Sequence, residues 1–261
     1  MRGRRVAFFG GSFDPPHLGH LAVARVARDA LQLDTVLFAP VGAQPLKPRG
    51  STASFDDRVA MTRLAIAGEA GFEISLADAP NATGEPNYTL DTLRSLRAAL
   101  PADGKLFCLM GADSFASLQR WRGAVEIPFV AALIVASRPG QQLDDLARYL
   151  PSGLALQSKP EDVISSGVGR SMGVRAHSKD QQFEKPVPET ATSAAVELRS
   201  YLIRNPAGQT ADFYLLPDLD VKISASEIRK HVRSAAAAPV VARSLLAAPV
   251  AAYIRTNALY R

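Results

Sequence analysis

The stretch Val6-Ala-Phe-Phe-Gly-Gly-Ser-Phe-Asp-Pro-Pro-His-Leu-Gly-His20 contains the strongest structural signal of the sequence. Its apolar run Val6–Phe9 predicts a buried strand that ends at a glycine pair. Helical spacing follows from Leu18 to Leu31, so we expect a strand, a glycine turn and a helix start. Glycines let the backbone approach a phosphate, and the unpaired N–H groups of a helix start attract anions. The stretch therefore predicts a phosphate-binding turn.

Two histidines, His17 and His20, stand at the predicted helix start, where a spacing of three places them on one face. Their imidazoles could donate hydrogen bonds to charge that develops on a phosphoryl group. One alternative is a zinc pair, for which only His177, His231 and carboxylates could supply a further ligand. The other is core packing, which two histidines flanking a glycine would do badly. Residue chemistry favours phosphate binding.

Apolar runs alternate with helical patterns along the first half of the chain. Strands are predicted at Thr35–Ala39, Phe72–Leu76, Lys105–Met110 and Phe129–Ala136, and helices from Phe55 to about Ala67 (with Ser54 as cap), from Thr89 to Leu100 and from Ser114. Continuous apolar strands are buried on both faces, which predicts an α/β fold with a doubly wound parallel sheet. Ligands of such sheets bind beyond the carboxyl ends of the strands, where Gly10-Gly11 and Gly111-Ala-Asp113 would both lie.

The pattern changes from about Gln157 to Thr190, where Ser, Gly, Pro and Gln are frequent and acidic and basic residues balance. We interpret this stretch as a surface insertion in a single domain that spans residues 1–261. Beyond it, the sequence predicts an amphipathic helix near Ala191–Ile203, a strand at Asp212–Leu216 and helices from about Ser226 and around Ala247–Thr256.

Composition narrows the class of protein. The 261 residues, 47% hydrophobic and 21% charged, suffice for a full core. The net charge is +5, but the basic residues are scattered, with no run longer than Arg4-Arg5. This distribution disfavours nucleic acid as a partner. The single cysteine, Cys108, allows no intramolecular disulfide and is expected in the core. No stretch reaches the roughly 20 apolar residues of a membrane span, and the basic start lacks a signal peptide's apolar region. We expect a cytoplasmic protein without a membrane partner.

A second motif, Ile223-Ser-Ala-Ser-Glu-Ile-Arg229, lies near the other end of the sequence. As local structure it is an ordinary helix start, with Ser224 or Ser226 as the cap. Its hydroxyls and helix N–H groups could also hold phosphates, with Arg229 as a planar cation. On the residues alone both interpretations stay open.

Together the two motifs resemble the HxGH nucleotidyltransferase superfamily, with His17-Leu-Gly-His20 as the name motif. The second motif resembles the element that completes the triphosphate site, although Ala225 replaces the usual Ser or Thr. A finer similarity, to bacterial nicotinate-nucleotide adenylyltransferases, is carried by Asn87-Tyr-Thr-Leu-Asp-Thr-Leu93, Gly111-Ala-Asp113 with Trp121, Ser137-Arg-Pro-Gly140, and Pro249–Tyr253 with Asn257–Tyr260. Asn87 and Arg122 depart from the Ser and the aromatic residue that are usual there, on the pyridine side of the site.

The resemblance implies a Rossmann-like nucleotidyltransferase fold with a C-terminal helical part. It implies transfer of AMP from ATP to nicotinate mononucleotide, giving deamido-NAD and pyrophosphate in NAD biosynthesis. The residues implied are His17, His20 and Arg229 in catalysis, Gly10, Gly11, Ser12, Phe13, Gly111, Asp113, Ile223, Ser224 and Ser226 in ATP binding, and Lys47, Thr89, Trp121 and Arg138 in substrate binding. Mg²⁺ is expected to arrive with ATP, without a dedicated cluster of metal ligands.

Purely structural roles for these residues, and other functions of the protein, are also compatible with the sequence. Trp121 could be a core residue, Asp113 a helix cap and Arg138 a solvated loop residue. The acceptor could be nicotinamide mononucleotide or phosphopantetheine, or the protein could be a non-catalytic nucleotide sensor on the same fold. The histidine pair argues against a sensor, because a pure binder need not stabilise a transition state. The sequence is compatible with a homo-oligomer.

Overall fold

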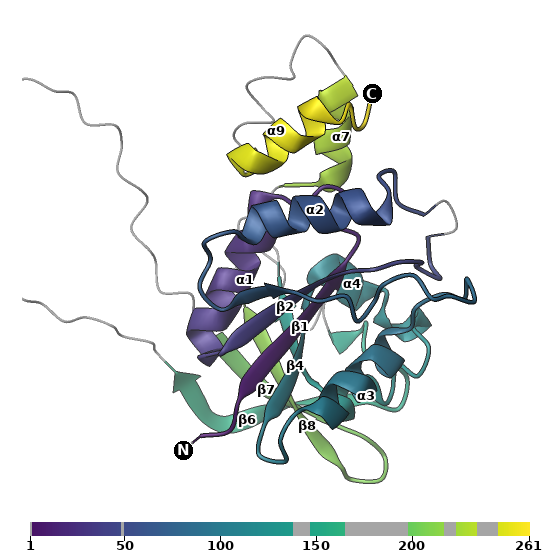
Figure 1. The fold of residues 1–261 in the computed structure, drawn as a ribbon. Helices are drawn as coiled ribbons and strands as arrows, with labels where there is room; N and C mark the ends of the chain where they lie inside the picture. Colours follow the sequence, from purple (N-terminus) through teal and green to yellow (C-terminus); the bar gives the residue numbers. More distant parts are fainter. Residues whose placement is uncertain (1, 48–49, 138–146, 165–197, 217–222, 234–244) are drawn as a thin grey trace, which may run out of the picture.

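The computed structural model describes residues 2–47, 50–137, 147–164, 198–216, 223–233 and 245–261. They form one eight-stranded sheet with helices on both faces (Figure 1). The strands are β1 (Arg5–Gly11), β2 (Thr35–Pro40), β3 (Phe72–Ile74), β4 (Lys105–Gly111), β5 (Ala132–Ala136), β6 (Ala155–Ile164), β7 (Leu198–Arg204) and β8 (Thr210–Leu216). The helices are α1 (Leu18–Leu31), α2 (Phe55–Ile66), α3 (Thr89–Ala99), α4 (Ala112–Ala116), the 3₁₀ helix η1 (Leu118–Arg120), α5 (Ile127–Val130), α7 (Ala225–Arg233) and α9 (Ala248–Thr256).

The strand order is β3-β2-β1-β4-β5-β8-β7-β6, and every pairing from β3 to β8 is parallel. The order reverses at β1, which lies between β2 and β4, so a switch point falls at its carboxyl end. Strands β7 and β6 extend the sheet in antiparallel fashion. The predicted doubly wound parallel sheet is confirmed, with an antiparallel addition at one edge.

Strand β1 shows why the apolar runs of the sequence are continuous. Val6 and Phe8 belong to one core, and Ala7 and Phe9 belong to the core on the opposite face. All four are buried. The first core also receives side chains of α3, α4 and α5, and the second receives those of α1. Cys108 is buried in the first core, as the sequence predicts, and its burial raises the pKa of the thiol to about 12.

A third core joins the C-terminal helices to the sheet domain through α2. Met61 of α2 packs with Ile228 of α7 and Ile254 of α9. Ile66, the last residue of α2, packs instead in the core that α1 shares with the sheet. Ser54 caps α2, accepting a hydrogen bond from the Asp57 N–H at 3.1 Å, as the sequence predicts. Helix α2 therefore contacts two cores.

The helix predicted near Ala191–Ile203 is wrong from Leu198 onward, and residues 191–197 lie outside the described residues. Leu198–Arg204 form strand β7, which pairs with β8 on one side and β6 on the other. The ladder joins residues that are distant in sequence, such as Arg199 with Leu215, and its hydrogen bonds override a local helical pattern. Strand β6 extends from Ala155 to Ile164 and so includes the first residues of the predicted surface insertion. Residues 165–190 of the predicted insertion lie outside the described residues.

The strand predicted at Phe129–Ala136 begins three residues later, at Ala132, because helix α5 precedes it. Pro128 explains the difference, since proline suits the first turn of a helix but cannot donate to the ladder of a central strand. Helix α4 begins at Ala112, two residues before the predicted start at Ser114. None of the helices in the described part of the chain is long and apolar enough to cross a membrane.

Candidate active site

A cavity of about 1030 Å³ lies at the carboxyl ends of β1, β4 and β5, and we call it the large cavity. Every predicted site residue that the structure describes lines it: Gly10, Gly11, Ser12, Phe13, His17, His20, Lys47, Thr89, Gly111, Asp113, Trp121, Ile223, Ser224, Ser226 and Arg229. The remaining one, Arg138, lies outside the described residues. The fold thus brings both sequence motifs to one site, at the edge of the sheet that the sequence predicts.

The turn after β1 is held tightly by aromatic side chains. A Cβ on Gly10 would lie 2.7 Å from the ring of Phe8, so only glycine fits without moving that ring. Phe13 adopts a left-handed backbone with φ of 46° and is 2% exposed. By contrast, a Cβ on Gly111 would meet no atom within 4 Å. Packing therefore requires glycine at position 10, near the end of β1, whereas the backbone at Gly111 faces open space.

The two histidines lie together at the start of α1. Their rings are stacked, with centroids 3.7 Å apart and an interplanar angle of 22°. The backbone N–H of His17, the N-cap residue, donates to Nδ1 of His20 at 3.2 Å. A neutral His20 must then carry its proton on Nε2, which leaves that nitrogen as a hydrogen-bond donor. Nδ1 of His17 is buried without a hydrogen-bond partner among the described residues.

Burial keeps both imidazoles neutral near pH 7. It lowers the pKa of His17 to about 4 and the pKa of His20 well below its ordinary value. The nearby charge of His17 lowers the pKa of His20 further. The aromatic neighbour Phe13, whose ring centroid is 5.0 Å from that of His20, contributes to this apolar environment. The pair can therefore donate hydrogen bonds to an anion without first being protonated.

Cationic side chains gather around Ser12, beside the histidines. The Lys47 ammonium donates to the Ser12 hydroxyl at 2.8 Å, and the Arg58 guanidinium donates to the Ser12 carbonyl at 2.8 Å. Arg229, from α7, donates to the carbonyl of Asp14 and, at 3.2 Å, to the hydroxyl of Ser226. Partial burial, and then the charge of Arg229, lower the pKa of Lys47. Crowded cations of this kind favour a polyanionic ligand.

Sequence reasoning missed Asp14 and Arg58. Asp14 is 4% exposed. Its place inside the first motif, directly before two prolines, is the sequence signal that could have identified it. Arg58 is 2% exposed on α2 and its guanidinium carbon lies 5.5 Å from the centre of the Phe55 ring. No sequence pattern identifies Arg58, because its partner Ser12 is 46 positions away.

The opposite end of the large cavity is formed by the start of α3 and by the segment after η1. Trp121 is half-buried against the core, and its indole N–H donates to the Ser117 hydroxyl at 3.0 Å, which fixes the ring. The guanidinium of Arg122 lies 4.6 Å from the centre of the Tyr88 ring and 3.6 Å from the carboxylate of Asp91. The departure at position 122 thus places an exposed cation at the rim of the cavity.

Gly111, rather than Asp113, is the N-cap of α4. Helix α3 begins at Thr89, as the sequence predicts, and Tyr88 is its N-cap. The N–H of Thr89 therefore has no acceptor within the helix. Asn87 ties this start in place, because its side chain accepts from the Ala43 N–H at 3.1 Å and donates to a loop carbonyl.

The zinc interpretation of the histidine pair finds no support in the described residues. Among them, no three or more His, Cys, Asp or Glu side chains are grouped so that they could hold a metal ion. The hydroxyls and cations that line the large cavity are suited to phosphate oxygens instead. A Mg²⁺ ion that arrives with a triphosphate takes most of its ligands from phosphate and water, which is consistent with this lining.

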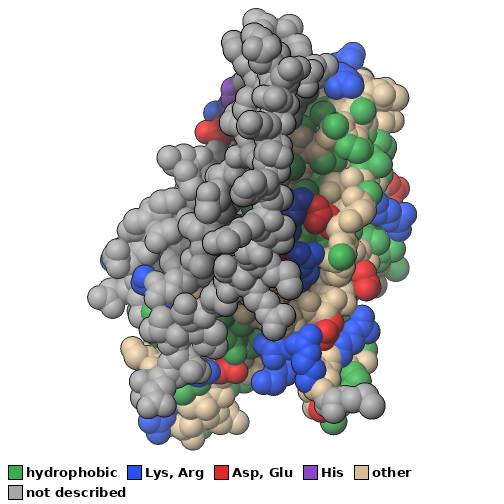
Figure 2. Space-filling model, turned by 90° about the vertical axis from the view of Figure 1, so that its left-hand side faces the viewer, with side chains coloured by type: hydrophobic (Ala, Val, Ile, Leu, Met, Phe, Trp, Pro, Cys, Tyr) green, Lys and Arg blue, Asp and Glu red, His purple; other side chains and the backbone are tan. Residues whose placement is uncertain are grey.

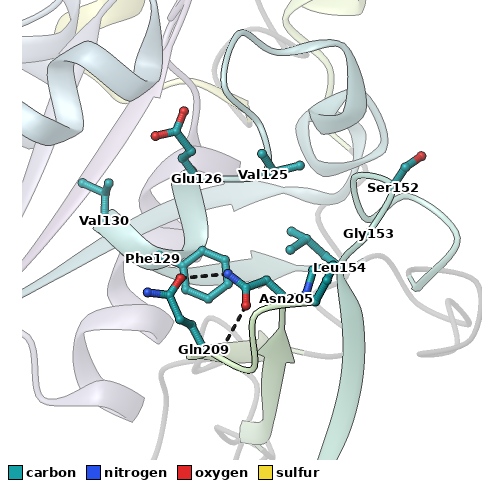
Figure 3. Close-up of a pocket in the computed structure, with 10 residues that line it drawn as sticks. Val125, Glu126, Phe129, Val130, Ser152, Gly153, Leu154, Asn205 and Gln209 are labelled. Atoms are coloured by element: carbon teal, nitrogen blue, oxygen red, sulfur yellow. Dashed lines mark hydrogen bonds between the residues drawn. The ribbon is translucent and has the colours of Figure 1, made fainter.

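A second, smaller pocket of about 420 Å³ lies between α5, the start of β6 and the turn between β7 and β8 (Figure 3). We call it the small pocket. Its amides satisfy one another: Asn205 donates to the Gln209 side chain at 2.8 Å and accepts from the Gln209 N–H at 2.9 Å. Its carboxylate, Glu126, is paired with Arg94. The small pocket therefore offers little unsatisfied polar chemistry.

Surface charge gives no continuous band on the face shown in Figure 2. Outside the residues drawn in grey, Lys and Arg side chains on this face are interspersed with Asp and Glu. A continuous basic stripe, which a nucleic-acid surface would need, is not visible among the described residues of this face. Lys47, Arg58 and Arg229 instead converge on the turn that follows β1.

Comparison with known sequences agrees with this geometry. The model of the cytidylyltransferase-like family matches residues 8–231. A probable nicotinate-nucleotide adenylyltransferase of Gloeobacter violaceus is 46% identical over 142 residues, which are 54% of this chain and 68% of that protein. Another, of Dehalococcoides mccartyi, is 37% identical over 176 residues, 65% of this chain and 85% of that protein.

A solved structure shares the fold over nearly the whole chain. It is a Plasmodium falciparum nicotinic acid mononucleotide adenylyltransferase complexed with NaAD, with a TM-score of 0.61 and 14% sequence identity. The alignment covers 98% of this chain and 97% of that one. At this identity the likeness concerns the fold, and the family assignment rests on the sequence matches. By those matches, the chain belongs to the cytidylyltransferase-like family of nucleotidyltransferases and, within it, to the nicotinate-nucleotide adenylyltransferases.

Proposed function

We propose that the chain transfers AMP from ATP to nicotinate mononucleotide. A phosphate oxygen of the mononucleotide attacks the α-phosphorus in line, and the bond from that phosphorus to the bridging oxygen of pyrophosphate breaks. Pyrophosphate leaves with the electron pair, and deamido-NAD is formed. The nucleophile is already an anion, so no general base is required. Catalysis consists of positioning the reactants and stabilising charge.

The histidine pair carries the proposal. His17 and His20 lie at the helix start, stacked and held neutral, and both line the large cavity. We assign them to the α-phosphate, whose oxygens gain charge as the fifth bond forms. A neutral donor fixed in advance suits this task, because it need not reorganise during the reaction.

The cations serve the two ends of the reacting phosphates. Arg229 and Ser226, from the start of α7, would hold the departing pyrophosphate. Lys47 would meet the phosphate of the mononucleotide from the facing loop. Mg²⁺ that arrives with ATP would neutralise part of the charge of the phosphates.

The acceptor end is assigned to the start of α3 and to Trp121. The indole ring, fixed by Ser117, would stack on the pyridine ring. The N–H groups at the start of α3, beginning at Thr89, would face the nicotinate carboxylate. A neutral carboxamide leaves these donors less well matched, at a cost of about 1–3 kcal/mol. We therefore expect nicotinate mononucleotide to be preferred over nicotinamide mononucleotide by at least about tenfold in kcat/KM.

Pyrophosphate release tests the proposal, with ATP and a panel of phosphorylated acceptors. We expect pyrophosphate release to depend on nicotinate mononucleotide. With nicotinamide mononucleotide, release should be at least about tenfold slower. Equal rates with the two would remove the specificity and leave the reaction class. A preference for phosphopantetheine would contradict the assigned acceptor. ATP binding without pyrophosphate release for any acceptor would favour a nucleotide sensor.

A further inference from the structure

The carboxylate of Asp14 lies where four separate parts of the chain meet. Its Oδ1 accepts from the Tyr260 hydroxyl at 2.7 Å and from the Ala53 N–H at 3.1 Å. Its Oδ2 accepts from the Thr52 N–H at 2.6 Å. Asp14 is 4% exposed, so these bonds are largely shielded from water. A buried carboxylate with this many donors is held in one orientation.

Arg229 completes the arrangement at the backbone of the same residue. Its Nη1 donates to the Asp14 carbonyl and lies 3.8 Å from the Asp14 carboxylate, while Nη2 donates to Ser226. The position of the guanidinium therefore depends on the position of Asp14. A shift in Asp14 would move the cation that we assign to the departing pyrophosphate.

Tyr260 is the side chain that closes the group around Asp14. It is 5% exposed and packs with α2, where its hydroxyl lies 4.0 Å from the Met61 sulfur. Its backbone is left-handed, with φ of 65°, which is unfavourable for a bulky side chain and is tolerated where other contacts fix it. Burial, and then the bond to Asp14, raise the pKa of the phenol, so it remains a donor at all working pH values.

We propose that Tyr260 is a positioning residue of the phosphate-binding site, which fixes Asp14 and through it orients Arg229. The proposal rests on the proposed role of Arg229 in holding the phosphates of ATP, but not on the identity of the acceptor. Tyr260 is 246 positions from Asp14 and does not line the large cavity, so it acts only through its partner. Without the hydroxyl, Oδ1 of Asp14 keeps only the Ala53 N–H as a donor, and the carboxylate is held less firmly.

Tyr260→Phe tests this with a matched control on the neighbouring helix. Tyr253, on α9, also donates to a carboxylate, Asp57 at 2.9 Å, but that pair is outside the large cavity. We expect Tyr260→Phe to raise the Kd for ATP with Mg²⁺, measured by calorimetry without an acceptor, by about tenfold. Tyr253→Phe should leave that Kd within about twofold of wild type.

A double-mutant cycle with Arg229→Ala separates positioning from general destabilisation. If Tyr260 acts through Arg229, Tyr260→Phe should change the Kd for ATP less than about twofold once Arg229 is absent. Equal losses in both backgrounds would overturn the proposal. So would an unchanged Kd in a Tyr260→Phe variant with a lowered Tm. Tyr260→Leu, which also lacks the hydroxyl, provides the same test should the phenylalanine variant not fold.

These outcomes are independent of the acceptor. If nicotinate mononucleotide proves to be the wrong acceptor, the Kd for ATP still reports on Tyr260. If pyrophosphate release is as proposed but the Kd for ATP is the same in Tyr260→Phe and Tyr253→Phe, only the positioning role is overturned.

Discussion

The large cavity lies at the carboxyl ends of the strands, and the small pocket lies at the amino ends of β5 and β8. The two differ in whether their polar groups already have hydrogen-bond partners. The large cavity follows the carboxyl ends of parallel strands, and Nδ1 of His17, one of its lining residues, has no partner among the described residues. The small pocket precedes β5 and β8, where Asn205 and Gln209 satisfy each other. Both are open and partly apolar, so a hollow surface alone does not distinguish them.

The difference follows from how each edge ends its strands. A parallel strand that leads into a helix start exposes N–H groups that have no partner in either element. A hairpin between antiparallel strands closes on itself, and its side chains complete the turn. We therefore expect ligands to bind where helix starts leave N–H groups unpaired. Where a turn pairs all of its polar groups, we expect those groups to contribute to stability alone.

The largest effect is expected at the histidines. His17→Ala should lower kcat by about 10²–10³ with much less change in the KM for ATP, because its donor acts mainly on charge in the transition state. Steady-state pyrophosphate release measures both constants. The control is His231→Ala on α7, since His231 does not line the large cavity. Turnover within about threefold of wild type in His17→Ala would mean that the pair is structural.

A second effect concerns pH and the stability of the large cavity. The folded-state pKa of His17, about 4, is below the ordinary 6.5, so the folded protein resists taking up a proton. The resulting stability is fully present above pH 6.5 and is lost as the pH falls toward 4. The loss from this residue should approach about 3 kcal/mol.

Urea unfolding of wild type and His17→Asn between pH 7 and pH 4 measures this term. The variant should lose less stability across the window, because asparagine does not titrate. Carboxylates titrate in both proteins and cancel in the difference. Parallel loss in the two proteins would show that His17 is solvated, and with that the argument for a neutral donor would be lost.

The small pocket should respond in stability alone. Asn205→Ala removes two hydrogen bonds of the turn between β7 and β8 and should lower the free energy of unfolding by about 1 kcal/mol. We expect kcat and the KM for ATP to stay within about twofold of wild type. A clear loss of activity in a stably folded variant would contradict the conclusion that the small pocket contributes to stability alone.

The smallest effect is expected from shortening the chain between β6 and β7. Ile164 and Leu198 are partners at the end of the antiparallel ladder, so a short Gly/Ser turn can replace residues 165–197. The expected kcat/KM is within about threefold of wild type, with cooperative melting as the control for folding. A large loss in a variant that still melts cooperatively would assign this segment to the site.

The sequence predicted the elements whose signals are local. The buried run Val6–Phe9, the glycine pair and the spacing of Leu18–Leu31 each report on neighbouring residues, and β1 and α1 form there. The same stretch places His17 and His20 correctly, because a helix fixes which residues share a face.

What the sequence could not predict depends on distant partners. Leu198–Arg204 become a strand because β8 and β6 pair with them, and no local pattern contains those strands. Arg58 and Tyr260 matter through Ser12 and Asp14, and side chains meet over such separations only once the fold exists.

Helix α2 has a mechanical consequence for the site. The histidines lie at the start of α1, which packs on the sheet, whereas Arg229 lies on α7. Helix α2 packs in the core of α1 and the sheet through Ile66, and in the core of α7 and α9 through Met61. With the roles that we propose for these residues, α2 is a spacer between the two groups that would hold the triphosphate. We expect any closure around ATP to rotate α2, which a pair of spin labels on α2 and α3 would record as a change in distance.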